Sequence, residues 1–318
     1  MKNLVLITIF IASLISCNNE TGQVEFMIHE KDLIPEGITY SSNTKSFYLG
    51  SLFKTKIIQI DSKTGAYKDF IPSDLIKMRF TGMIVDDHNN DLWTCGNMRE
   101  NETVHSAVFR FNLLSNEIKK VYSCPDSLPH LLNDLVLDDF GNVYFTDSNG
   151  QRIYKIDIKT DKVNVFFESN EIEYPNGITI SPDNTKLYIA SYYNGLKILD
   201  IKERKIINSI NKTINSSNLD GIKYYKNSII GIQNYINANE KCNITRFYLN
   251  KDITQIINAK VMDKNNPNFD YPTTFVIVNE ALYCIANSQL GNVNFTENNI
   301  PNPEKLTAIK ILKYKLHW

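Results

Sequence analysis

The chain has 318 residues with 34 basic and 35 acidic side chains, so it lacks the excess positive charge that nucleic-acid binding requires. Its hydrophobic content of 42% supports a sizeable core and excludes intrinsic disorder. The length would allow two domains, but single all-β domains of this size are common, and we predict one globular domain over 18–318.

Residues 1–17 are predicted to be a targeting signal rather than part of the fold. Lys2 precedes an apolar run over 4–13, which is too short to span a membrane. The run closes in LISC at 14–17, which resembles a bacterial lipobox, whose cysteine is lipidated and becomes the new N-terminus. The alternative is an ordinary secretory signal with a chance cysteine. We therefore expect lipidation at Cys17, a location in the bacterial cell envelope (periplasmic or outer-membrane face), and membrane contact through the lipid anchor alone.

Four cysteines remain after this segment, Cys95, Cys124, Cys242 and Cys284. None belongs to a C-x-x-C pair, so zinc ribbons and thioredoxin-like chemistry are unsupported. Export would permit disulfides, but the spacing selects no pairing, and buried free thiols are the simplest expectation.

A pattern of short strands repeats along the rest of the chain. Each unit has an apolar strand, a turn rich in Pro, Asn, Asp or Gly, and then a second and a third strand. The first strands of the six units are predicted to start at Glu36, Thr81, Asn133, Asn176, Asp220 and Thr273. The intervals of 45, 52, 43, 44 and 53 residues suit four-stranded blades with variable loops. The pattern predicts an all-β, six-bladed β-propeller.

The two ends of the chain are predicted to close the propeller together. The sixth unit ends after its third strand, close to Trp318, and an extra strand over 23–29 precedes the first unit. This N-terminal strand would complete the last blade and leave no open sheet edge.

The six starting residues should form a ring at one mouth of the channel, because the first strand of each blade lines it. Glu36, Asn133, Asn176 and Asp220 would then converge as two carboxylates and two amide oxygens. Such a set suits Ca²⁺, with another divalent cation such as Mg²⁺ or, least favoured, Zn²⁺ as the alternative. Turn formation by the Asn-Gly and Asp-Gly pairs is the competing interpretation. Glu36 does not fit it, because Glu is not a turn-forming residue.

Loops joining second to third strands should return to the face that carries this ring. Three of them, over 95–106, 233–243 and 287–305, are long and are expected to wall a pocket above the cation. Asp147, Tyr192, Asn234 and Asn287 lie where they could touch a substrate. For each of them an exposed strand end without a role is the alternative.

These segments resemble the senescence marker protein/gluconolactonase/luciferin-regenerating enzyme family over roughly 30–316. The resemblance is carried by PEG at 35–37, NDLV at 133–136 with VYFTD at 143–147, PNG at 175–177 and LDG at 219–221. It implies that Glu36, Asn176 and Asp220 bind a divalent cation and that Asn133 is a further ligand or a substrate contact. It also implies that Asp220 is the catalytic base or nucleophile.

The activity that the resemblance implies is calcium-dependent hydrolysis of a small lactone or a related ester, whose carbonyl is polarised by the metal and attacked by water. Sugar lactonases of the family carry an arginine where this chain has Leu131 and a glutamate where it has Gln151, so a sugar lactone is not predicted. His130 matches no motif of paraoxonase-like relatives and is interpreted as a structural loop histidine.

Other catalytic patterns are absent from the sequence, which has no G-x-S-x-G, no H-E-x-x-H and no P-loop. The alternative function is a non-catalytic propeller lipoprotein that binds a ligand or partner and keeps calcium for structure. A lyase-like or strictosidine-synthase-like propeller is less favoured, because such relatives need not keep the acidic cage. We expect a monomer.

Overall fold

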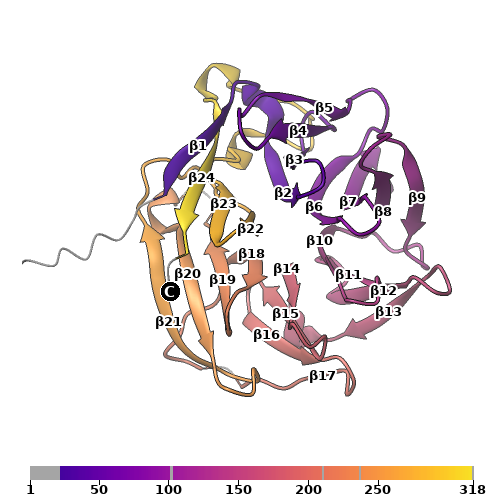
Figure 1. The fold of residues 1–318 in the computed structure, drawn as a ribbon, viewed down its shortest axis with the longest axis vertical. Coiled ribbons are helices and arrows are strands. Elements are labelled where there is room, and N and C mark those ends of the chain that lie inside the picture. The colour runs from indigo at the N-terminus through magenta and orange to yellow at the C-terminus, as the bar shows by residue number, and fades with distance from the viewer. Residues whose placement is uncertain (1–21, 101–102, 210, 236–237, 317–318) are drawn as a thin grey trace, which may run out of the picture.

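Six four-stranded antiparallel sheets form a ring in the computed structural model, which describes residues 22–100, 103–209, 211–235 and 238–316 (Figure 1). The predicted six-bladed β-propeller is confirmed. The signal segment 1–17 and its Cys17 lie outside the described residues. Within the described ranges, no helix is long and apolar enough to span a membrane.

The blades follow one another in chain order, and each sheet is numbered from the channel outward. Blades one to three consist of β2 (Pro35–Ser41), β3 (Ser46–Ser51), β4 (Ile57–Asp61) and β5 (Tyr67–Ile71); β6 (Arg79–Asp86), β7 (Asp91–Glu100), β8 (Thr103–Asn112) and β9 (Ile118–Ser123); and β10 (Leu132–Leu137), β11 (Val143–Asp147), β12 (Arg152–Asp157) and β13 (Lys162–Glu168). Blades four to six consist of β14 (Pro175–Ile180), β15 (Lys186–Ser191), β16 (Gly195–Asp200) and β17 (Lys205–Ile206); β18 (Leu219–Tyr224), β19 (Ser228–Gln233), β20 (Asn243–Leu249) and β21 (Ile256–Lys264); and β22 (Phe275–Val278), β23 (Ala281–Ile285), β24 (Ile309–Lys315) and β1 (Gln23–Ile28).

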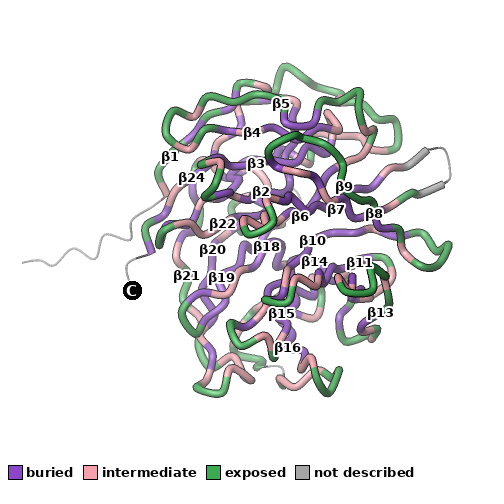
Figure 2. Tube along the Cα trace, turned by 45° about the vertical axis from the view of Figure 1, so that its right-hand side comes forward, coloured by how far each residue is buried: buried purple, intermediate pink, exposed green. Residues whose placement is uncertain are grey.

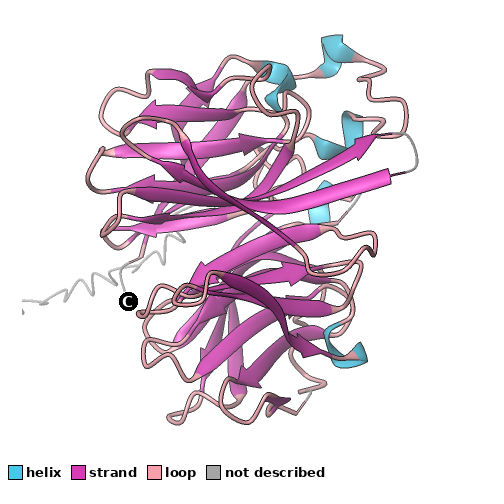
Figure 3. Cartoon of the chain, turned by 90° about the vertical axis from the view of Figure 1, so that its right-hand side faces the viewer, coloured by secondary structure: helices cyan, strands magenta, loops and turns pink. Residues whose placement is uncertain are grey.

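Short 3₁₀ helices supply the remaining regular structure. They are η1 (Lys31–Leu33), η2 (Asn170–Ile172), η3 (Asn239–Lys241), η4 (Leu290–Asn292) and η5 (Pro303–Lys305). Figure 3 shows these helices on one side of the molecule, the side toward which the β7–β8 hairpin projects.

The segment 95–106, expected to be a long loop, is for the most part a continuation of the sheet. The β7 and β8 ladder continues from Asp91↔Asn112 to Glu100↔Thr103, so the two strands form a long hairpin. The expectation of a loop was wrong because unbroken backbone pairing satisfies these polar groups better than an irregular path would. The other two long loops contain η3 in one case and η4 and η5 in the other.

The core lies between neighbouring blades, where apolar faces of adjacent sheets pack together. Buried positions gather on the inner strands, whereas the outer turns are exposed (Figure 2). Trp93, Tyr48, Tyr154 and Tyr188 are among the largest fully buried side chains. The four described cysteines are free thiols, three of them buried, which confirms the simplest expectation from the sequence.

The predicted closure of the ring by the N-terminal strand is confirmed. In blade six β1 pairs antiparallel with β24. Phe26 of β1 is buried, and its ring lies 5.4 Å from that of Phe47 in blade one and 6.4 Å from that of Tyr283 in β23. The first strand in the sequence therefore joins the last blade to the first through apolar packing as well as hydrogen bonds.

This closure predicts that alanine substitutions in β1 lower the free energy of unfolding at buried positions but not at exposed ones. Phe26→Ala should lower the free energy of unfolding by about 3 kcal/mol, because it removes a buried ring at the junction of two blades. Met27, with 45% of its surface exposed on the same strand, is the matched control, and Met27→Ala should change stability by less than about 0.5 kcal/mol. Urea unfolding of both variants measures the difference; equal effects would contradict a closing role for β1.

Candidate functional site

Each of the first five blades has a bulge in its channel-lining strand. In blade one the pairing of β2 with β3 jumps from Pro35↔Ser51 to Ile38↔Leu49, so Glu36 and Gly37 together face a single partner residue. The same two-against-one register shift occurs in the other four, at residues 81–82, 133–134, 176–177 and 220–221. A bulge re-aims a side chain away from the regular alternation of a strand. Five of the six predicted starting residues therefore occupy bulges, and the sixth, Thr273, lies just before β22.

The glycines that follow these residues are required by close packing, not by turns. A Cβ atom at Gly177 would lie 2.3 Å from the backbone oxygen of Asp220, and one at Gly37 would lie 2.0 Å from that of Thr81. Neither glycine has a positive φ. Adjacent first strands approach so closely around the channel that a side chain does not fit. The interpretation of the Asn-Gly and Asp-Gly pairs as simple turns is therefore wrong.

The six starting residues, which we call the inner ring, all border one cavity of about 440 Å³. Glu36, Asn133, Asn176 and Asp220 are buried there. Thr81 and Thr273 use their hydroxyls to hold neighbouring blades: Thr81 donates to the Leu132 carbonyl at 2.8 Å, and Thr273 to that of Glu36 at 3.1 Å. The inner ring thus separates into four members with potential ligand oxygens and two that join blades.

The four potential ligands each present a buried oxygen without a hydrogen-bond partner among the described residues. These atoms are Glu36 Oε2, Asn133 Oδ1, Asn176 Oδ1 and Asp220 Oδ1. Buried polar atoms are nearly always paired in native proteins, so four orphaned acceptors beside one cavity indicate a missing partner. Two carboxylates and two amide oxygens fit a hard divalent cation such as Ca²⁺. The described part of the chain contains no group of three or more His, Cys, Asp or Glu side chains that could hold a metal. The four-oxygen set is not such a group, because two of its members are amides.

Burial and mutual repulsion disfavour the charged forms of the two cage carboxylates. Burial, followed by repulsion from Asp220 and Asp134, raises the pKa of Glu36 well above its ordinary value. Burial also raises the pKa of Asp220 to about 8, which the hydrogen bond from Asn234 partly opposes and the charge of Asp134 reinforces. The nearby Lys223 ammonium is 3.6 Å from Asp134 and compensates only in part. A bound cation would supply the missing positive charge.

Asn234, predicted as a substrate contact, instead lies behind Asp220 and does not border the cavity. Its amide donates to Asp220 Oδ2 at 2.5 Å and to the Pro272 carbonyl at 3.0 Å. One carboxylate oxygen of Asp220 is thereby fixed, and the other, Oδ1, is left for a ligand.

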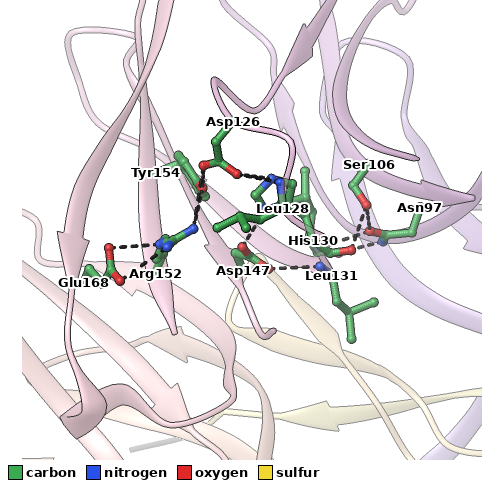
Figure 4. Close-up of polar contacts among 11 residues, drawn as sticks. Asn97, Ser106, Asp126, Leu128, His130, Leu131, Asp147, Arg152, Tyr154 and Glu168 are labelled. Atoms are coloured by element: carbon green, nitrogen blue, oxygen red, sulfur yellow. Dashed lines mark hydrogen bonds and ion pairs between the residues drawn. The ribbon is translucent and has the colours of Figure 1, made fainter. Parts of the chain in front are cut away.

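Asp147 is also set back from the cavity, behind His130 (Figure 4). It is fully buried, with Oδ2 2.7 Å from His130 Nδ1 and Oδ1 accepting from the Leu131 backbone N–H at 2.9 Å. His130 itself borders the cavity, and its Nε2 lies 3.1 Å from Asp126 Oδ1, without the geometry of a hydrogen bond. The histidine therefore has the structural fixation that we expected, but also a place on the cavity wall that the sequence did not reveal.

The β7–β8 hairpin positions the neighbouring Asn133 through its backbone. Asn97 accepts from the Leu132 N–H at 2.9 Å and donates to the Leu132 carbonyl at 2.8 Å (Figure 4). Ser106 donates to the carbonyl of His130 at 3.0 Å. The start of β10 is therefore fixed immediately before its bulge.

The two remaining predicted contacts differ in their placement. Tyr192 borders the cavity and donates from its hydroxyl to the Asn234 carbonyl at 3.3 Å. Asn287 does not border it: its side chain accepts from the Lys310 N–H at 2.7 Å and donates to the Ala308 carbonyl at 2.9 Å, which fixes the loop that contains η4.

Arg79, Tyr174 and Tyr271 border the cavity but were not singled out from the sequence. Each stands two positions before an inner-ring residue, as does Leu131, which the family resemblance had marked and which also borders the cavity. This shared spacing is a signal that could have identified them.

Comparisons with known proteins agree with this geometry. A family model described as "SMP-30/Gluconolactonase/LRE-like region" matches residues 34–209, more than half of the chain. A search of curated proteins gave no match.

Solved structures share the fold at low sequence identity. A gluconolactonase from Xanthomonas campestris is 11% identical with a TM-score of 0.60, and the match covers 91% of this chain and 87% of that one. Regucalcin from Agrobacterium tumefaciens, a calcium-binding protein, is 13% identical with a TM-score of 0.61, covering 93% and 96%. Virginiamycin B lyase from Staphylococcus aureus is 18% identical with a TM-score of 0.59, covering 94% and 89%.

Identities this low establish the shared propeller alone, and the neighbours include a lyase as well as a gluconolactonase. The family itself rests on the sequence match across blades one to four. The chain therefore belongs to the SMP-30/gluconolactonase/LRE-like family.

Proposed function

We propose that this protein is a calcium-dependent hydrolase of lactones or related esters. The observation that carries the proposal is the set of four orphaned oxygens, from Glu36, Asn133, Asn176 and Asp220, beside a cavity large enough for a small molecule. Family membership supports it, since the family description names gluconolactonase.

When bound at these oxygens, Ca²⁺ would polarise the substrate carbonyl and stabilise the oxyanion that develops on it. Asp220 is placed to orient and deprotonate the attacking water, because Asn234 holds Oδ2 while Oδ1 has no protein partner. The water oxygen bonds to the carbonyl carbon, the acyl C–O bond breaks, and the proton passes through Asp220 to the leaving alkoxide. The product is a hydroxy acid from a lactone, or an acid and an alcohol from an ester.

Calcium binding is tested first by thermal unfolding of protein stripped with a chelator. Titration with calcium should raise the unfolding midpoint, by about 2.7 kcal/mol of stability at a hundredfold excess over Kd. Asp220→Ala should abolish the calcium-dependent rise, because it removes one of the two carboxylates of the cage. Asp74→Asn, which alters an exposed carboxylate in the turn after β5, should keep it. A midpoint that responds to neither calcium nor magnesium would contradict a metal site.

The raised carboxylate pKa values predict a distinctive pH dependence in the presence of chelator. A carboxyl whose pKa is raised by folding binds more protons in the folded state, so its contribution to stability falls as pH rises through the folded pKa. For Asp220 the folded value is about 8 against an ordinary value of 3.8, so unfolding midpoints should fall as pH rises toward about 8 and level off above it. Asp220→Asn should reduce the fall, and saturating calcium should remove it. If the unfolding midpoint falls equally in wild type and in Asp220→Asn, the fall is caused by other titratable groups.

Catalysis is tested with calcium-loaded protein and a panel of lactones and aryl esters, with acid release followed by a pH indicator. Asp220→Asn should lower kcat/KM at least a hundredfold, because it removes the base, whereas Asp74→Asn should match wild type. If wild type turns over no member of the panel but still binds calcium, the protein is a non-catalytic binding propeller with a structural cation.

A further inference from the structure

The residues two positions before the inner ring form a second set, which we call the outer ring. Its members are Ile34, Arg79, Leu131, Tyr174, Asn218 and Tyr271. Four of them, Arg79, Leu131, Tyr174 and Tyr271, border the cavity. The outer ring therefore supplies part of the cavity wall beyond the four cage oxygens.

Two outer-ring tyrosines are held in an unusual backbone conformation. Tyr174 and Tyr271 have φ values of 50° and 59°, and each precedes a proline, Pro175 and Pro272. Bulky residues rarely adopt the left-handed region, and a residue before proline normally prefers an extended conformation. Both side chains nevertheless border the cavity. Ile34 and Asn218 share this conformation, with φ values of 47° and 57°, so it belongs to the entry into the blade and fixes the direction in which the two tyrosine rings point.

Further aromatic rings extend this wall in blade four. The Tyr174 ring lies 6.0 Å from that of Tyr192 and 6.0 Å from that of Tyr193, and the latter two are 5.3 Å apart, all edge to face. Tyr193 also borders the cavity and has 61% of its surface exposed, so its ring is available to a ligand.

The cavity wall also contains apolar side chains from other blades. Leu52 of blade one packs in one cluster with Leu290 and Phe295 of the loop after β23, and all three border the cavity. The Arg79 guanidinium lies over the Phe295 ring at 4.7 Å and donates to Asn298 Oδ1.

Two polar side chains of the wall outside the cage are engaged within the protein. Asn97 uses both ends of its amide on the Leu132 backbone, and His130 Nδ1 lies 2.7 Å from Asp147 Oδ2. A polyhydroxylated ring would bury several of its hydroxyls against tyrosine ring faces and leucine side chains, and burying a hydroxyl without a hydrogen-bond partner is unfavourable.

We infer that the cavity selects lactones or esters whose body is a flat apolar ring, such as an aryl lactone, over polyhydroxylated sugar lactones. This inference rests on the proposed function for the reaction, but the selection itself is a property of the wall and can be measured without turnover. Tyr174 and Tyr271 are its specificity-determining residues.

Binding is measured by calorimetry on calcium-loaded protein with two ligands that cannot be hydrolysed. These are 1-tetralone, a flat bicyclic ketone, and 1,5-anhydroglucitol, a polyhydroxylated ring. Tetralone should bind at least tenfold more tightly. Tyr174→Ala and Tyr271→Ala should each weaken it by about three- to tenfold through loss of ring contacts, whereas Tyr174→Phe should bind as wild type does. Tyr67→Ala removes an exposed tyrosine of the outer strand β5 and serves as the matched control.

Turnover of dihydrocoumarin and of glucono-1,5-lactone separates this inference from the proposed function. Faster turnover of dihydrocoumarin with tyrosine-dependent tetralone binding supports both. Tyrosine-dependent tetralone binding without turnover of either lactone supports the inference and overturns the hydrolase. Faster turnover of gluconolactone, or equal binding of the two unreactive ligands by wild type, overturns the inference whether or not the alanine variants fold.

Discussion

The close approach of the first strands around the channel is the constraint from which the site follows. Backbone atoms of neighbouring blades come so near to Gly37 and Gly177 that neither position has room for a side chain. To pass this contact, each of five strands adds one residue against its partner, and that extra residue turns a polar side chain toward the channel mouth. Packing and site geometry are therefore set by one feature of the backbone.

Gathering these side chains concentrates negative charge in a buried place, which the protein tolerates because the frame is stabilised elsewhere. The blades bury large aromatic side chains such as Trp93 and Tyr188 between them, and β1 closes the ring by pairing with the last strand of the sequence, β24. Two ring positions that could have added ligands carry threonines, which join blades instead. The cage is thus limited to four oxygens, with two formal charges that a divalent cation would balance.

Sequence reasoning identified the parts of the molecule that depend on periodicity. The blade count, the closing strand and the inner ring follow from the spacing of Glu36, Thr81 and their counterparts, because a repeat places equivalent residues at one height around the axis. It could not tell which strand ends face the cavity. Asp147, Asn234 and Asn287 lie behind the wall, since each pairs with a neighbouring loop that only the folded structure brings near. The continuation of the ladder through 95–106 was hidden for the same reason.

The outer ring shows how the wall of such a cavity can vary while the inner-ring oxygens stay in place. Inner-ring residues sit in bulges that the packing of the channel dictates, whereas outer-ring residues stand where the chain enters the blade, and four of them take left-handed backbone angles there. Leu131, Tyr174 and Tyr271 shape the cavity wall at these entries, and other side chains there would alter the wall but leave the bulged backbone and its oxygens in place. The residues that would bind the cation and the residues that shape the rest of the pocket are thereby two positions apart along the chain. Family membership and the cage can be shared by proteins whose walls, and hence whose substrates, differ.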